Sequence, residues 1–201
     1  MDAIVGVVVE ILESDGYDAV QLREVARRAH VSLATIYKRF PTRDELIVTA
    51  VEHWMAANSY TGLAPPAADE SLYDGLMRVF RYVFEPWERS PRMLEAFHRA
   101  CTGPGRDRLE LQGASAIFPV AFAVLEGADP AYVDDIESVL TNMVHALIGR
   151  FADGTLSITA ILPTLERAVY RLVANNEPEA TAVRVGRIER LGRAELRPHR
   201  T

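Results

Sequence analysis

Residues 16–46, GYDAVQLREVARRAHVSLATIYKRFPTRDEL, decide the fold. Apolar residues at helical spacing predict a short helix over about 22–29, and His30-Val31-Ser32 then breaks the pattern. Ser32 can cap a second short helix over 33–40, because its side chain can accept a backbone N–H of the first turn, and a proline ends that helix. Two short helices joined by a tight turn predict a helix-turn-helix, whose second helix fits the major groove of DNA.

The second of these short helices carries the candidate DNA contacts. Thr35 can hydrogen-bond a base edge or a phosphate, Tyr37 has a hydroxyl that reaches a phosphate, and Lys38 supplies charge. Arg43 adds a phosphate site beside the N-terminus of the next helix, where backbone N–H groups point outwards. The full set expected from this segment is Ser32, Leu33, Ala34, Thr35, Tyr37, Lys38 and Arg43.

The charge distribution agrees with contact through one end of the molecule. The chain of 201 residues has a net charge of −6, which by itself speaks against nucleic-acid binding. Residues 19–46, however, hold six basic and three acidic residues, whereas residues 47–174 hold ten basic and sixteen acidic ones. A short basic segment on an acidic body is typical of a protein that touches DNA with one end only.

The rest of the chain also predicts helices, and no segment shows the alternation of a strand. A first helix buries Ile4, Val7, Val8 and Ile11 and ends at Gly16, and residues 62–68 form a linker. The other expected helices cover about 42–60, 71–86, 91–101, 106–126, 131–150 and 157–174, with Pro86 ending or kinking one and Pro119 kinking another. The side chains expected inward in the helix over 131–150 are Val133, Ile136, Val139, Leu140, Met143, Val144 and Leu147.

The segment 16–46 resembles the signature of the TetR family of transcriptional regulators. The shared features are a glycine-aromatic pair, a Val-Ser turn, a Thr-Ile-Tyr recognition helix that ends in Phe40, and a basic residue and a carboxylate before Leu46. The family often has glycine where Ala34 stands and lysine where Arg43 stands; the second change keeps the charge.

The resemblance implies an all-α fold with three parts. Residues 1–46 would form the helix-turn-helix DNA-binding domain, and residues 47–176 a ligand-binding and dimerisation bundle. Residues 177–201 form an Arg-rich tail, helical or disordered, for which a solvated face is the simplest interpretation and contact with the dimer or with DNA the alternative. The resemblance further implies a homodimer through about 131–174 that binds double-stranded operator DNA and is released by a small effector. Thr35, Tyr37, Lys38 and Arg43 would contact the DNA, with Gln21 near its backbone.

Large apolar side chains in the body predict a lipophilic effector. The candidate lining residues, with His98 as a polar member, are Phe80, Phe84, Trp87, Met93, Phe97, His98, Cys101, Phe118, Phe122 and Met143. The stretches GYDAVQLREVARRAHV and PRMLEAFHRA also resemble the mycobacterial regulators of cholesterol catabolism, which implies a steroid-derived acyl-CoA thioester that is large, apolar and anionic at one end. An unrelated lipophilic compound is an equal alternative.

Other functions find little support in the sequence. His98 and Cys101 lie at i, i+3, but no orienting acid accompanies them as in an enzyme, and further ligands for a metal are missing. We therefore expect no catalysis, cofactor or metal, and the absence of a long apolar run and of a signal segment predicts a cytoplasmic protein without a membrane contact. The remaining alternative is a helical small-molecule or protein-binding module whose DNA-binding head does not function.

Overall fold

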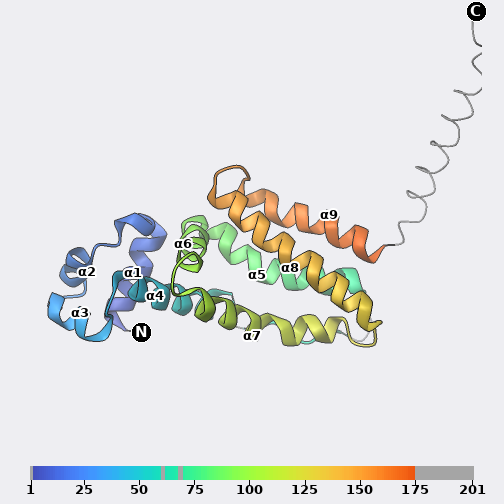
Figure 1. Ribbon diagram of the computed structural model, residues 1–201, viewed down its shortest axis with the longest axis horizontal. Coiled ribbons are helices and arrows are strands. Elements are labelled where there is room, and N and C mark those ends of the chain that lie inside the picture. The colour runs from blue at the N-terminus through green and yellow to red at the C-terminus, as the bar shows by residue number, and fades with distance from the viewer. Residues whose placement is uncertain (1, 60–61, 68–69, 175–201) are drawn as a thin grey trace, which may run out of the picture.

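The computed structural model describes residues 2–59, 62–67 and 70–174, and within these residues every regular element is a helix. The expected Arg-rich tail, 177–201, lies outside the described residues. Figure 1 shows a head, formed by the first helices of the chain, beside a longer body formed by the others. The predicted all-α fold is confirmed.

Residues close in the sequence determine where the helices of the head begin and end. It consists of α1 (Ala3–Ser14), the 3-10 turn η1 (Tyr17–Ala19), α2 (Leu22–Arg28), α3 (Leu33–Arg39) and the first part of α4 (Arg43–Asn58). Gly16 follows α1 with a φ of +87°, which a residue without a Cβ adopts at low cost. Ser32 Oγ accepts the Thr35 N–H at 3.1 Å, and Thr42 Oγ1 accepts the Glu45 N–H at the same distance. These two caps begin α3 and α4 where the sequence predicts.

The body is built from longer helices. They are α5 (Leu72–Arg89), α6 (Pro91–Cys101), α7 (Arg106–Val124), α8 (Pro130–Ala152), the 3-10 turn η2 (Ile158–Ala160) and α9 (Ile161–Val173). Figure 1 shows α7 along one long edge of the body, α8 and α9 along the other, and α6 at the junction with the head. Pro86 and Pro119 lie inside α5 and α7, so α5 continues three residues past the proline that was expected to end or kink it.

One continuous core joins the head to the near part of the body. Its buried members include Ile4 in α1, Trp54 in α4, Leu94 in α6 and Leu147 in α8. The boundary expected between residues 46 and 47 falls within α4, because this helix carries the head core directly into the body. A second cluster at the far end of the body contains Leu76, Met77, Leu125, Ile136, Leu140 and Val169.

The inward face of α8 differs from the expectation at one position. Ile136, Leu140 and Leu147 are buried, but Val139 is 45% exposed. Val139 lies at the edge of the apolar stripe, and the neighbouring helices cover only the centre of that stripe. None of the helices in the described ranges is long and apolar enough to cross a bilayer.

Candidate DNA-reading surface and candidate effector cavity

The outer side of α3 carries most of the candidate DNA contacts. Tyr37 is 55% exposed, and Ala34, Thr35 and Lys38 are exposed beside it, whereas Ile36 points into the core. Burial of a single apolar residue anchors this helix and leaves its opposite face uncovered. An exposed tyrosine and lysine contribute nothing to the head core, so they are available for contact with another molecule.

The other candidates flank this face. Ser32 is exposed, and its Oγ lies 2.9 Å from Thr35 Oγ1 in addition to capping α3. The Thr35 hydroxyl is therefore held in a defined position before any DNA is present. Leu33 is half-buried in the head, and Gln21 is exposed at the N-cap of α2.

Arg43 is placed differently from a phosphate-binding side chain. Its guanidinium donates to two backbone carbonyls, those of Tyr17 and Val20, and stacks over the Tyr17 ring at 4.8 Å. Nη1 also lies 3.7 Å from a carboxylate oxygen of Asp44. Arg43 thus fixes η1 against α4, a role that depends on residues more than twenty positions away and that sequence reasoning missed.

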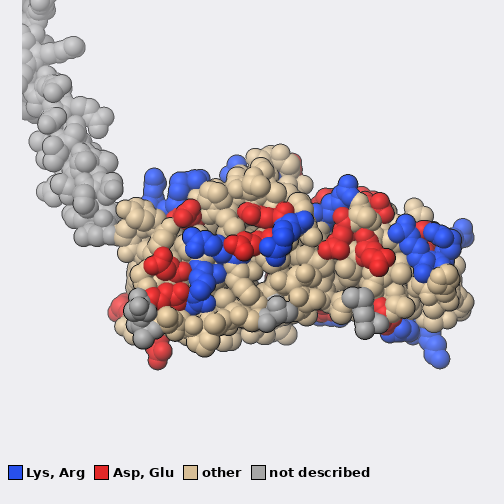
Figure 2. All heavy atoms as spheres, turned by 180° about the vertical axis from the view of Figure 1, so that it is seen from behind, with Lys and Arg blue, Asp and Glu red and all other residues tan. Residues whose placement is uncertain are grey.

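Most of the basic groups near α3 are paired within the chain. Glu24 accepts hydrogen bonds from Arg27 and Arg28, which lower its pKa to about 2, and Arg39 pairs with Asp2. Lys38 forms no ion pair within the described part of the chain, so its charge stays available. Figure 2 shows basic side chains gathered at the outer end of the head.

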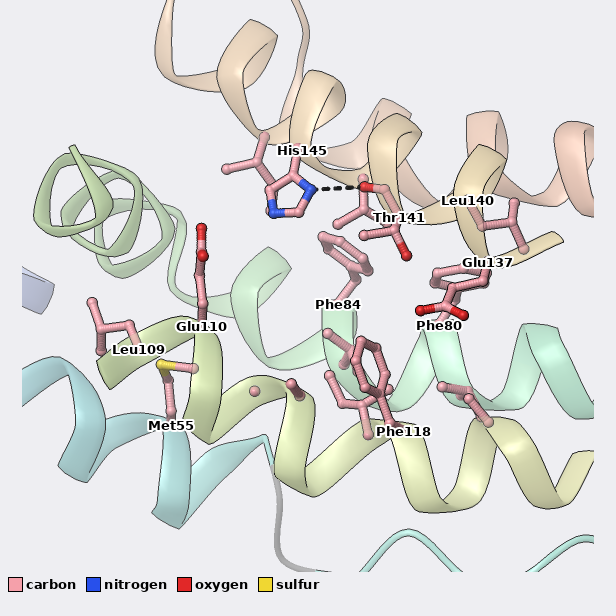
Figure 3. A pocket seen from close by; sticks show the side chains of 18 of the residues that line it. Met55, Phe80, Phe84, Leu109, Glu110, Phe118, Glu137, Leu140, Thr141 and His145 are labelled. Atoms are coloured by element: carbon pink, nitrogen blue, oxygen red, sulfur yellow. Dashed lines mark hydrogen bonds between the residues drawn. The ribbon is translucent and has the colours of Figure 1, made fainter. Parts of the chain in front are cut away.

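The body contains a cavity of about 600 Å³ with a mostly apolar lining. Five helices contribute: the end of α4 with Met55, one face of α5, two residues of α6, and long stripes of α7 and α8. Figure 3 shows α8 on one side and α7 on the other, with Phe80, Phe84 and Phe118 between them. A cavity of this volume and lining suits a small lipophilic molecule.

Six of the ten sequence-derived lining candidates contribute to this cavity. They are Phe80, Phe84, Trp87, Phe97, Phe118 and Phe122. Met93 is instead fully buried in the core, while His98, Cys101 and Met143 are partly buried outside the lining. On α6 only Leu94 and Phe97 face the cavity, because residues one position away point about 100° around the helix.

The residues that sequence reasoning missed lie mainly on α7 and α8. On α7 five of them follow one stripe at helical spacing: Glu110, Ala114, Ile117, Ala121 and finally Leu125 at the C-cap. The others are Asp107, Leu109, Leu111 and Gly113. On α8 they are Ile136, Glu137, Leu140, Thr141, Val144 and Ile148. The spacing was visible in the sequence, but such a stripe equally predicts ordinary core.

Cys101 is unsuited to nucleophilic chemistry in this environment. Burial, with a smaller contribution from the Glu110 charge, raises the pKa of its thiol to about 12. The thiol therefore stays protonated at neutral pH and packs as a small apolar side chain. Among the described residues, no group of three or more His, Cys, Asp or Glu side chains could hold a metal ion.

Two of the contacts between the head and the cavity wall involve α5 and α6. Trp87 lines the cavity and packs against Trp54 of α4 with ring centroids 4.5 Å apart, and Trp54 Nε1 donates to Glu13 of α1 at 2.7 Å. On α6, Arg99 pairs with both carboxylate oxygens of Asp18 at 2.7 and 2.8 Å and lies over the Tyr17 ring at 4.1 Å. A displacement of α5 or α6 by a ligand would therefore act directly on α1, α4 and η1.

Comparison with known families matches both parts of the chain. The family described as "Bacterial regulatory proteins, tetR family" matches residues 4–50, and "Tetracyclin repressor-like, C-terminal domain" matches residues 70–172, which is half of the chain. The sequence is also similar to the HTH-type transcriptional repressor KstR: 32% identical over 85 residues to the protein of Rhodococcus jostii (strain RHA1), and 33% identical over 91 residues to that of Mycolicibacterium smegmatis. These matches cover 42% and 45% of this chain but only 39% and 44% of the relatives.

Solved structures share the fold. A TetR transcriptional regulator from Rhodococcus sp. RHA1 superposes with a TM-score of 0.64 at 19% identity, over 86% of this chain and 97% of that one. A second TetR-family regulator, from Rhodococcus sp., gives a TM-score of 0.58 at 18% identity with the same coverage. The arrangement of head and body is thus shared at low sequence identity.

Proposed function

Because the chain belongs to the TetR family of bacterial regulatory proteins, we propose that it binds a pseudo-palindromic operator as a homodimer and leaves it when a small lipophilic effector fills the cavity. The α3 helix of each subunit enters a major groove, and the half-sites lie about 10 bp or a multiple apart. The observation that carries this proposal is the capped α3 helix with Tyr37 and Lys38 exposed on a face that the fold leaves uncovered.

Dimerisation is proposed through α8 and α9. Both helices leave large apolar side chains exposed, Val139 on α8 and Tyr170 on α9, the latter 59% exposed. Helices that expose apolar residues in this way are suited to bury them against a second copy. The two-fold symmetry of such a dimer would then match the symmetry of the operator.

The effector acts through the contacts between the cavity and the head. A ligand beside Trp87 and Phe97 shifts α5 and α6, and the shift reaches the head through Trp54 and Arg99. The two α3 helices then no longer match the spacing of the half-sites. An effector works as a switch only if it binds this second arrangement more tightly, with a coupling of about 1–3 kcal/mol.

The test is a fluorescence anisotropy titration of the intact protein against the intergenic DNA upstream of its own gene, with a scrambled duplex for comparison, at two salt concentrations. We expect specific binding that weakens steeply with salt, because phosphate contacts release counterions. Tyr37→Ala and Lys38→Ala should each weaken binding about tenfold or more without loss of helicity or dimerisation. Arg89→Ala, a charge change at the exposed end of α5, should leave the affinity unchanged.

Two results would contradict the proposal. Loss of dimerisation in the Tyr37 or Lys38 variant would show that this face packs within the dimer. Equal binding of generic DNA by both variants and by the original protein would show that α3 is not a DNA-reading helix, and would favour the helical binding module with a non-functional head.

A further inference from the structure

The acidic residues in the cavity lining restrict the chemistry of the ligand. Among the described residues, the lining includes the carboxylates Asp107, Glu110 and Glu137 but neither lysine nor arginine. In an apolar cavity a charge interacts more strongly than in water, because the medium screens it less. A ligand that brings its own carboxylate or phosphate into this cavity would meet charge of the same sign, with neither lysine nor arginine among the described lining residues to pair it.

The two half-buried carboxylates differ in their partners. Glu110 Oε1 lies 2.8 Å from Arg106 Nε, so this carboxylate has a partner within the chain. Glu137, on α8, forms no ion pair or hydrogen bond within residues 2–59, 62–67 and 70–174. Figure 3 shows its carboxylate beside Phe80 at one end of the cavity. A carboxylate next to an aromatic ring and without a partner is best stabilised by a hydrogen-bond donor or a cation.

The other end of the cavity also presents an acceptor. His145 Nδ1 lies 2.9 Å from the Thr141 carbonyl oxygen, and since a carbonyl only accepts, Nδ1 carries the proton. In the neutral ring Nε2 is then an acceptor, and Figure 3 shows this nitrogen directed toward the cavity. Eight residues of α8 separate His145 from Glu137, which corresponds to about 12 Å along the helix.

We propose that the cavity selects an elongated lipophile that carries a hydrogen-bond donor, either uncharged or cationic, and that Glu137 is the residue that recognises this group. The proposal rests on the proposed function only in taking the cavity as the ligand site. It excludes from the cavity the anionic group that a resemblance to regulators of cholesterol catabolism implies.

The test uses three probes with the same ten-carbon chain and different end groups: decylamine, decan-1-ol and decanoate. Binding to the intact protein is followed by tryptophan fluorescence, because Trp87 lines the cavity and Trp54 packs against it, and by calorimetry, at concentrations where the probes form no micelles. We expect decylamine to bind about tenfold or more tightly than decanoate, with decan-1-ol between them.

Glu137→Gln removes the charge and keeps the shape, so it should reduce the ratio of the decylamine and decanoate affinities to within about threefold of unity. Glu85→Gln is the matched control, since Glu85 is exposed on α5 outside the lining and its substitution should leave the ratio unchanged. Equal affinities for the three probes in the original protein, tightest binding of decanoate, or a ratio unaltered by Glu137→Gln would each overturn the selection while leaving the cavity as a binding site. Failure of all three probes to bind would overturn the cavity as the effector site as well; DNA binding is measured separately and stays unaffected by either result.

Discussion

The helices α4 and α7 are of similar length but bury their side chains very differently. The 16 residues of α4 include seven that are buried, whereas the 19 residues of α7 include one, Leu109. Moreover, α7 leaves Leu111, Phe118 and Phe122 exposed, the first of them at 68%. Both helices are rich in apolar residues, so the difference lies in what each helix faces: α4 runs through a packed core, and α7 forms one wall of a cavity.

This difference separates two uses of apolar side chains. In the head, apolar residues hold α3 in position with its outer face exposed, and the contacts among them are complete without another molecule. Along α7, apolar residues face a space that the chain itself does not fill. Substitutions in the two regions should therefore affect different properties, and four experiments test this from the largest expected effect on the folded molecule to the smallest.

Two leucine-to-alanine substitutions, one in each helix, should differ most in their effect on the free energy of unfolding. Leu46→Ala in the core of α4 should lower the free energy of unfolding by about 2–5 kcal/mol, because it removes buried contacts and leaves a void. Leu111→Ala on α7 should lower it by less than about 1 kcal/mol, since little of that side chain is removed from water. Urea denaturation followed by circular dichroism measures both values. Equal losses would mean that α7 is packed as tightly as the head.

A substitution in the turn between α6 and α7 tests how closely the head packs against the body. A Cβ at Gly105 would overlap Cγ2 of Val48 and lie about 3 Å from its Cγ1 and Cβ, so either the valine side chain or the turn must shift. Gly105→Ala should cost about 1–3 kcal/mol of stability in the same assay. Gly103→Ala is the control, because its nearest neighbour would be 3.7 Å away. A Gly105 variant as stable as the control would show that the turn yields without cost.

Substitution at the Arg99–Asp18 pair tests how a ligand in the cavity affects the DNA-binding head, rather than the stability of the fold. Hydrogen bonding to Arg99 lowers the pKa of the exposed Asp18 carboxyl, so the pair is present above the ordinary pKa of aspartate and is lost as the pH falls through the lowered value. Arg99→Gln should leave the free energy of unfolding at pH 7 nearly unchanged. It should bring the ratio of the DNA affinities without and with a bound lipophile closer to one. Anisotropy titrations with and without the ligand measure that ratio. An unchanged ratio would show that the coupling does not pass through this ion pair.

The smallest effect is expected at Cys101. With its pKa raised to about 12, the thiol should react with a disulfide reagent at pH 8 far more slowly than a free cysteine, and at the ordinary rate once the protein is unfolded in urea. Absorbance of the released thiolate follows both reactions. Fast reaction in the native state would indicate that α6 opens at the junction between the head and the body.

Much of the fold and part of the sites follow from sequence. The caps at Ser32, Thr42 and Asp129 and the proline that begins α6 depend on residues within three or four positions of one another. Hydrogen bonds over so short a span form in the same way wherever the helix is placed, which is why the helix starts and the exposed face of α3 could be predicted.

The sequence by itself determined an all-α chain with a helix-turn-helix at residues 16–46 and a basic face on a short, capped helix. Only the tertiary structure decided that Arg43 binds the carbonyls of Tyr17 and Val20, and that Leu94 rather than Met93 faces the cavity. It also placed Glu137 beside Phe80, with no ion-pair or hydrogen-bond partner in the part of the chain that the structure describes. The physical reason is that an apolar stripe fixes which side of a helix avoids water, but not whether that side meets another helix or an unfilled space.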